Sequence, residues 1–444
     1  MKRFGVLCMA LLLELGCASH SDKTKEIRSA LDAGQPKTAL KLLNEELETD
    51  SEKQLPADTG GDNSLLLLDR AMVLQQLQMY DLSSRDLEVS DKQIDMLDMS
   101  RSTVDDIGKY LFSDDTGPYR APPFEKLMIN TMNMVNYLVR GNLQGARVEA
   151  RRLAVMQKYL KDTDPDNALT APGSYLAGFT FEKSGQPDVA LRYYDEALQY
   201  GEYRTLAGPV RRLLAQSGYS TPRLKKLAES GPVEPEEEKD EQRGELLVIV
   251  SYGRVPAKIA QRVPIGLALT YASGALSPHD RAQANSLAAQ GLVTWVNFPE
   301  LGKPRGQYDA PWFTLDGRRQ PLEGIVAVDR EAARAWEDVK GTVVASAITR
   351  MISRVVAGKG VQAAAGNDSP VGLILGLATQ ATLTAADTPD TRSWATLPAR
   401  IAFGRVLLPP GPRTVQLSAR GAQTVKKVDI KPGGFAVVNL TVLE

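Results

Sequence analysis

The segment Ala386–Ile401, ADTPDTRSWATLPARI, gathers side chains that could do chemistry. Asp387 and Asp390 are two carboxyl groups close together in the sequence, and paired carboxyl groups carry the acid–base chemistry of most glycosidases. That chemistry also needs a sugar-binding cleft, but aromatic residues make up only 6% of the chain and no stacking platform for sugars is evident. A cell-wall (peptidoglycan) hydrolase that uses these carboxylates is therefore the alternative interpretation, and not the first one.

The same segment contains the residue types of a structural junction. Asp390 can cap a turn or pair with an arginine, for which Arg392 is the nearest candidate. Trp394 is a large apolar anchor with one N–H group that needs a partner, and Pro398 favours an extended path into the following strand. Because no base or nucleophile lies nearby in the sequence, we interpret Asp390, Arg392, Trp394 and Pro398 as a structural junction.

Other groups that usually carry catalysis are scarce. The chain has two histidines, His20 and His279, and two cysteines, Cys8 and Cys17. We expect His20 in a flexible tether and His279 exposed in the first turn of a helix. The sequence has no H-E-x-x-H zinc motif, no G-x-S-x-G elbow and no phosphate-binding glycine loop. The sequence therefore predicts no catalytic residue, no metal site and no cofactor, and a protein that is not an enzyme.

The N-terminus has the layout of a secretory signal. Met1–Arg3 is basic, and Phe4–Leu13 is an apolar run of about ten residues, too short to span a bilayer. The LGCAS stretch that follows, with Cys17 at its centre, resembles the lipobox of bacterial lipoproteins. The match departs from the family pattern at Glu14, three positions before the cysteine, where leucine is usual. A plain secretory signal is the alternative.

The lipobox resemblance implies cleavage after residue 16 and lipidation of Cys17. Several acyl chains would then anchor the protein stably in a membrane. Ala18 at the next position implies, by resemblance to Gram-negative sorting, an outer-membrane lipoprotein that faces the periplasm. With Cys8 removed and Cys17 acylated, the mature chain would have no cysteine for a disulfide, a nucleophile or a metal.

The length of 444 residues is sufficient for two or three domains, and the net charge of −1 gives no basic field that would favour nucleic acid. We expect a multidomain α+β protein. Its expected parts are a signal peptide (1–16), a helical repeat domain (17–230), an acidic linker (231–244), an α+β domain (245–398) and a small β-sandwich-like unit (399–444).

Two segments of the helical part match closely. Gly34–Leu47 and Gly185–Leu198 both read as a turn, Gly-Gln-Pro, followed by an amphipathic helix with a small alanine at the same place. The second copy resembles the tetratricopeptide repeat, a helix pair that stacks into a curved, peptide-binding or protein-binding surface. An irregular helix bundle is the alternative. The candidate protein-binding residues are Tyr175, Phe181, Tyr193 and Tyr194.

After the charged linker the periodicity changes to that of strands. Glu245–Tyr252 is expected to be a buried strand, and Val263–Tyr271 is a second candidate strand. Asp329–Ala357 has apolar residues at helical spacing, and Val371–Ala385 is apolar on nearly all faces. We expect these two segments to form a core hairpin. A partner or oligomer contact through Val371–Ala385 is the first alternative, and membrane insertion the last.

Three motifs resemble those of a group of poorly characterised proteobacterial lipoproteins with tetratricopeptide-like N-terminal halves. They are DTRSWATLPARI (390–401), YRAPPFEK (119–126) and GELLVIVSYGRVPAK (244–258). The resemblance implies a partner protein in the periplasm, in cell-wall synthesis or in the assembly of surface machinery. We expect an outer-membrane-anchored scaffold or assembly factor for an envelope complex; the alternatives are the hydrolase and a self-assembling subunit of an envelope machine.

Overall fold

The computed structural model describes residues 19–96, 119–163, 168–230, 242–272, 274–289, 295–303, 309–364 and 388–444. The fold is mixed α+β, with helices before residue 230 and the large sheets after residue 243, as the sequence predicts at this level. Four expected features lie outside the described residues: the signal peptide with Cys17, most of the acidic linker, Val371–Ala385 and Asp387.

Helices of the N-terminal half pack in consecutive pairs joined by short turns. Their bounds are α2 (His20–Lys23), α3 (Lys25–Asp32), α4 (Pro36–Glu46), α5 (Asp62–Gln76), α6 (Tyr80–Gln93), α8 (Pro123–Val139), α9 (Leu143–Thr163), α10 (Thr170–Lys183), α11 (Pro187–Tyr200), the 3₁₀ turn η2 (Arg204–Leu206), α12 (Ala207–Leu214) and α13 (Pro222–Ser230).

The turns between paired helices share one backbone conformation. Gly34 and Gly185, the matched glycines of the sequence, have φ angles of 66° and 69°. Gly141 before α9 and Gln78 before α6 have φ angles of 68° and 65°. Glycine adopts this left-handed region without steric cost, whereas Gln78 is a strained exception. The common turn gives the helical half a repeat-like arrangement.

Strands dominate the described part of the C-terminal half, where three further helices also lie. The short pair β1 (Asp95–Met96) and β2 (Arg120–Ala121) belongs to the helical half. The other elements are β3 (Gly244–Tyr252), β4 (Lys258–Pro264), α14 (Ile265–Tyr271), α15 (Pro278–Ala289), β5 (Trp295–Leu301), β6 (Trp312–Leu315), β7 (Arg318–Gln320), β8 (Glu323–Ala327), α16 (Val328–Ala364), β9 (Arg400–Leu408), β10 (Gly411–Ala419), β11 (Ala422–Ile430) and β12 (Phe435–Val442).

Two four-stranded sheets are built from strands far apart in the sequence. The first has the order β12-β3-β9-β8 and the second β11-β10-β6-β7. Strand β3 pairs in parallel with β12 and antiparallel with β9. The strands of residues 399–444, which the sequence analysis groups into a unit of their own, thus hydrogen-bond to β3, β8 and β6 of the preceding segment.

Strand β3 is buried on both faces, which explains its uninterrupted apolar run and confirms the expected buried strand. Leu246, Val248 and Val250 pack in the core between the two sheets. Leu247 and Ile249 point the other way, into a core shared with the helices. The main body therefore has three layers: helices, the first sheet and the second sheet.

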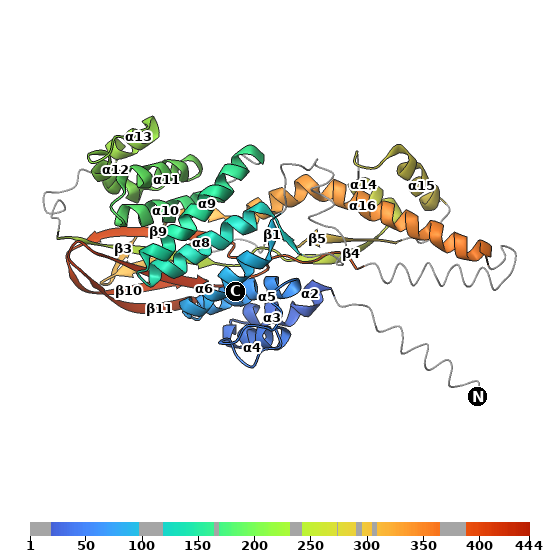
Figure 1. The fold of residues 1–444 in the computed structure, drawn as a ribbon, viewed down its shortest axis with the longest axis horizontal. Helices are drawn as coiled ribbons and strands as arrows, with labels where there is room; N and C mark the ends of the chain where they lie inside the picture. Colours follow the sequence, from blue (N-terminus) through green and yellow to red (C-terminus); the bar gives the residue numbers. More distant parts are fainter. Residues whose placement is uncertain are drawn as a thin grey trace.

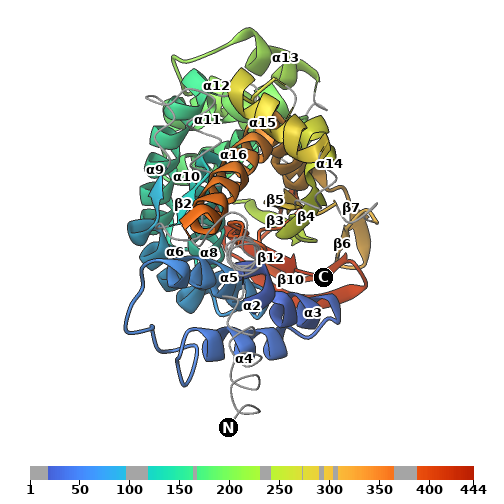
Figure 2. The same ribbon diagram turned by 90° about the vertical axis from the view of Figure 1, so that its right-hand side faces the viewer.

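The helices wrap around the first sheet as an arc, with the strands inside it (Figures 1 and 2). Helices α5 and α8 contact β12, and α10 contacts β8. The ring of Tyr175 on α10 stacks on Phe403 of β9 with centroids 4.3 Å apart, and Phe179 meets Phe435 edge to face at 5.5 Å. The inner side of the helical arc is thus covered by the chain's own sheet.

A separate core lies in the part of the molecule formed by β4, β5, α14, α15 and α16, on the right of Figure 1. Helix α16 has 37 residues and is about 55 Å long. The expected strand Val263–Tyr271 is wrong beyond Pro264, because that proline ends β4 and precedes helix α14. Ser277 caps α15, its Oγ accepting from the Asp280 N–H at 3.1 Å.

Candidate functional site

Residues 389–399 run through the interior without helix or strand, and every one of them is buried. Irregular backbone normally lies at the surface, because a buried N–H or C=O group without a partner is costly. This segment, the joint, can therefore lie in the interior only if other residues bind its polar backbone groups. It includes Asp390, Arg392, Trp394 and Pro398, the four residues interpreted as a structural junction.

Carboxylates on two helices bind the backbone of the joint. The Trp394 N–H donates to Glu125 Oε1 of α8 at 3.3 Å. Thr396 donates both its N–H and its hydroxyl to Asp69 Oδ1 of α5, at 3.0 and 2.7 Å. These contacts fasten the joint to two different helix pairs.

The connection between β3 and β4, together with the start of β4, binds the other side of the joint. The Val255 N–H donates to the Leu397 carbonyl at 2.9 Å, and the Lys258 N–H donates to Ser393 Oγ at 3.2 Å. The joint therefore lies between the helical half and the strands after residue 244, and hydrogen-bonds to both.

Asp390 and Arg392 form the ion pair that the sequence predicts. Asp390 accepts from the backbone N–H, Nε and Nη2 of Arg392 at 3.0, 2.9 and 2.8 Å. Arg392 also lies 3.4 Å from Asp62 Oδ1 of α5, and its guanidinium is 5.8 Å from the ring centre of Tyr119. Both oxygens of the Asp390 carboxylate are thus engaged inside the protein.

His20 lies at the same joint and not in a flexible tether, so that expectation is wrong. It begins α2, is only 4% exposed, and its neighbour Ser21 donates its N–H to Thr391 Oγ1 at 2.9 Å. Burial lowers the pKa of His20 to about 4 although the carboxylates of Asp62 and Asp390 favour its charged form. The local sequence carries no signal for this position, because Thr391 lies 370 positions from Ser21. His279, by contrast, is exposed as expected.

Burial also shifts the pKa values of three ionisable side chains around the joint. Burial raises the pKa of Asp69 to about 7, against the hydrogen bonds from Thr396, and it also raises the pKa of Glu125. Burial lowers the pKa of Lys258, although Asp390 and Glu125 oppose this. Shifted pKa values often mark functional sites. Buried polar networks that hold a core in one arrangement shift pKa values in the same way.

The three motifs of the sequence analysis meet at this network. Tyr119 donates its hydroxyl to Glu125 within the YRAPPFEK motif. Lys258 ends the motif that contains β3, and its charge interacts with both Glu125 and Asp390. The motifs thus describe one buried site assembled from three distant segments.

The four candidate protein-binding residues are in different environments. Tyr175, Phe181 and Tyr194 are at most 3% exposed, so they form core contacts and no accessible surface, which corrects the expectation. The Tyr194 hydroxyl donates to Glu182 Oε2 at 2.6 Å and accepts from Arg405 of β9 at 2.8 Å. The sheet covers the helix faces that carry Tyr175 and Tyr194, whereas Phe181 stacks on Tyr193. Only Tyr193 of the four is partly exposed.

Tyr193 lines a groove between α9 and α11 on the outer side of the helical arc. The groove has a volume of about 330 Å³, within the range of small binding sites. Its lining residues are Ala154, Gln157, Lys158, Lys161, Val189, Arg192, Tyr193 and Glu196. This groove is accessible where the inner side of the arc is not.

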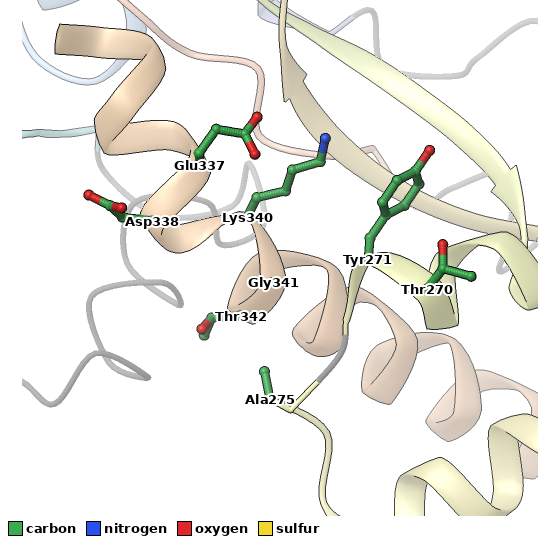
Figure 3. Close-up of a pocket in the computed structure, with 8 residues that line it drawn as sticks. All are labelled: Thr270, Tyr271, Ala275, Glu337, Asp338, Lys340, Gly341 and Thr342. Carbon is green, nitrogen blue, oxygen red and sulfur yellow. The ribbon is translucent and has the colours of Figure 1, made fainter.

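A second hollow of about 550 Å³ lies between α14 and α16 (Figure 3). Lys340 extends from α16 toward Tyr271, with its ammonium nitrogen 4.9 Å from the ring centre and 3.0 Å from Glu300 Oε1 of β5. Glu337 and Asp338 also line this hollow, but Figure 3 shows Asp338 pointing away from Lys340. The lysine contacts tie α16 to α14 and β5, which is a packing role.

Among the described residues, no group of histidines, cysteines and carboxylates is placed to hold a metal ion. None of the described helices combines the length and the apolar character that a membrane span requires. Comparison of the sequence with known protein families and with curated proteins finds no match.

Proposed function

We propose that this chain is a lipid-anchored protein of the outer membrane that faces the periplasm and acts as a protein-binding scaffold or assembly factor for an envelope complex. The observation that carries the proposal is the division of the helical arc into two sides. The inner side is covered by β3, β8, β9 and β12, and the outer side offers the groove between α9 and α11. A partner would therefore bind the outer side.

As part of the same proposal, the helix pairs of the N-terminal half are tetratricopeptide-like repeats. Support comes from the shared turn at Gly34, Gly141 and Gly185 and from the close packing of Gly178 against the Tyr194 ring. Repeats of this kind usually bind partners on their concave side. In this chain the equivalent side would bind the sheet permanently, and the convex side would take over recognition.

The anchor would also set the position of the body. Two peptide bonds separate Cys17 from Ser19, the N-cap of α2, so the Cα atom of a lipidated Cys17 would lie at most about 7 Å from that of Ser19. Because α2 is fastened to the joint through Ser21 and Thr391, a lipid there would hold the folded body close to the membrane.

The test is site-specific photo-crosslinking in cells. A photoreactive amino acid at Val155, which is 70% exposed on α9, should yield a crosslinked protein from the envelope. The same photoreactive amino acid placed at Val425, which is 60% exposed on β11, is the matched control and should give no crosslink. Equal crosslinking at both positions, or none at Val155, would argue against a partner on the outer helical side. Loss of membrane association in Cys17→Ser, measured by fractionation, tests the anchor separately.

A further inference from the structure

The floor of the groove between α9 and α11 is held in one shape by hydrogen bonds and stacking. The Tyr193 ring lies parallel to Phe181 at 5.5 Å between centroids, and its hydroxyl donates to the Ala150 carbonyl at 3.0 Å. Gln157 is buried and donates to Ser174 Oγ at 2.5 Å. Because the lining is already ordered, a ligand would lose little affinity to reorganisation of the protein.

Cations surround this floor. Lys158, Lys161 and Arg192 line the groove together with one carboxylate, Glu196, which lies 3.1 Å from Lys161. The Arg192 guanidinium is held 4.9 Å from the ring centre of Tyr219, so its position is fixed at the rim. The groove therefore carries an excess of positive charge, although the chain as a whole has a net charge of −1.

The exposed face of α9 extends this positive charge. Among its described side chains, Arg151, Lys158 and Lys161 are exposed, whereas Arg152 pairs at 3.1 Å with the buried Glu149. Positions 148, 151, 155 and 158 lie on one side of a helix because of their spacing. The charged stripe thus continues directly from the groove.

Two valines interrupt the cations on that stripe. Val148 is 42% exposed and Val155 is 70% exposed, the largest exposure among the large hydrophobic side chains of the described residues. Apolar side chains framed by cations favour a partner that has both apolar groups and carboxylates. A small anion would satisfy the charges and leave the valines and the Tyr193 ring in water.

We infer that the groove and the adjoining stripe of α9 bind an acidic segment of a partner protein that inserts an apolar side chain between α9 and α11. This inference rests on the proposed scaffold function and specifies its partner. The carboxylates would pair with Lys158 and Arg192, and the apolar side chain would pack on Tyr193, Ala154 and Val189. Complementary charge would mainly speed association and exclude basic partners.

The test uses the purified full-length protein and a short fluorescein-labelled peptide of repeated Glu-Glu-Leu units, with binding measured by fluorescence polarisation. Two peptides serve as controls: one with serine in place of leucine and one with glutamine in place of glutamate. The double variant Lys158→Glu and Arg192→Glu reverses the rim charge. Lys37→Glu and Arg318→Glu together change the net charge equally at exposed positions elsewhere, and circular dichroism checks that all variants fold.

The expected result is binding of the acidic peptide that the rim variant weakens by about tenfold or more and the control variant leaves unchanged. Each peptide control should bind more weakly than the parent peptide. The inference is overturned if the acidic peptide does not bind, if both double variants weaken it equally, or if the serine peptide binds as well as the leucine peptide. It is also overturned if anionic lipid vesicles or peptidoglycan compete with the peptide at the groove and bind more tightly.

The two proposals fail in different ways. If the crosslink at Val155 captures a protein but the acidic peptide does not bind, the scaffold role survives and the partner chemistry is wrong. If the peptide binds through Lys158 and Arg192 but nothing crosslinks in the envelope, the groove chemistry stands without the scaffold role.

Discussion

Replacing Arg405 with methionine should destabilise the protein strongly, because this arginine neutralises two buried carboxylates. Arg405 lies on β9 with its side chain 1% exposed. Its Nη2 is 2.6 and 2.7 Å from the two carboxylate oxygens of Glu182 on α10, and 2.8 Å from Glu245 Oε2 on β3. It therefore joins the helical layer to the first sheet.

The size of the effect follows from the burial of these carboxylates. Burial alone would raise the pKa of Glu182 and Glu245, but the attraction of Arg405 and then of Lys183 holds both pKa values below the ordinary value. Removing one partner of a buried pair typically costs about 3–5 kcal/mol of unfolding free energy. Lys183 remains 3.1 Å from Glu182, so we expect a loss of about 3 kcal/mol, at the lower end of that range.

Urea-induced unfolding followed by circular dichroism measures this loss. The matched control is Arg413→Met, since Arg413 pairs at 3.3 Å with Asp316 on the surface and both side chains are partly exposed. An exposed pair contributes at most about 1 kcal/mol, so the control should change the unfolding free energy by less than that.

The pH dependence separates the loss of charge pairing from a simple packing defect. A carboxylate whose folded pKa lies below its unfolded value stabilises the fold above the unfolded pKa, and this stabilisation is lost as the pH falls. Without Arg405, burial should raise the pKa of Glu182 and Glu245. The destabilisation by Arg405→Met should therefore be largest near about pH 7 and smaller near about pH 5.

Two results would refute this reasoning. One is a loss below about 1 kcal/mol, the scale of an exposed pair. The other is a loss that does not change with pH. If Arg405→Met fails to fold, the combined variant with Glu182→Gln and Glu245→Gln serves instead. This triple variant has no buried carboxylate at these two positions, so its unfolding free energy should return most of the way to that of the unmodified protein. A triple variant as unstable as Arg405→Met would also refute the charge argument.

Four further changes have expected outcomes in thermal or urea unfolding. Burial lowers the pKa of His20 from 6.5 to about 4, so between these pH values the unfolded chain takes up a proton that the folded one does not. The unfolding free energy should therefore fall as the pH drops through this range. In His20→Gln the melting temperature should depend less on pH. Trp394→Ala should cost about 3–5 kcal/mol of unfolding free energy in urea, because Trp394 is 1% exposed. Gly178→Ala would place a Cβ 2.5 Å from the Tyr194 ring and should cost about 1–3 kcal/mol, with a lower melting temperature. In Gly266→Ala, on α14, nothing lies within 4 Å of the new Cβ, and the melting temperature should rise.

Elements with a strong local pattern could be predicted from the sequence. The apolar run of β3, the helical spacing of α16 and the turn before α11 each depend on residues close together in the chain. The expectation of a strand after Pro264 is wrong because a short apolar run fits a buried helix as well as a strand. Pro264 ends β4 and is the N-cap residue of α14.

Contacts between distant segments could not be predicted in this way. The Gly-Gln-Pro repeat pattern identifies the helix pair, but it does not say that β9 covers the faces of α10 and α11 that carry Tyr175 and Tyr194. The same holds for His20, whose burial depends on Asp62 and on the joint. The groove between α9 and α11 likewise depends on how the two helices pack, although the sequence analysis already names Tyr193, which lines it.

The joint explains how a segment without helix or strand can have so distinctive a sequence. A regular strand satisfies its backbone through a ladder that tolerates many side chains, whereas the backbone of residues 389–399 depends on particular side-chain partners. Thr396 is restricted by Asp69, and Arg392 is restricted by Asp390 and Asp62. Each restriction follows from the cost of leaving a buried polar group unpaired. A concentration of charged, hydroxyl and aromatic residues in one short stretch therefore indicates a buried polar joint as readily as an active site, and the two are told apart by whether the carboxylate oxygens are already bonded within the protein.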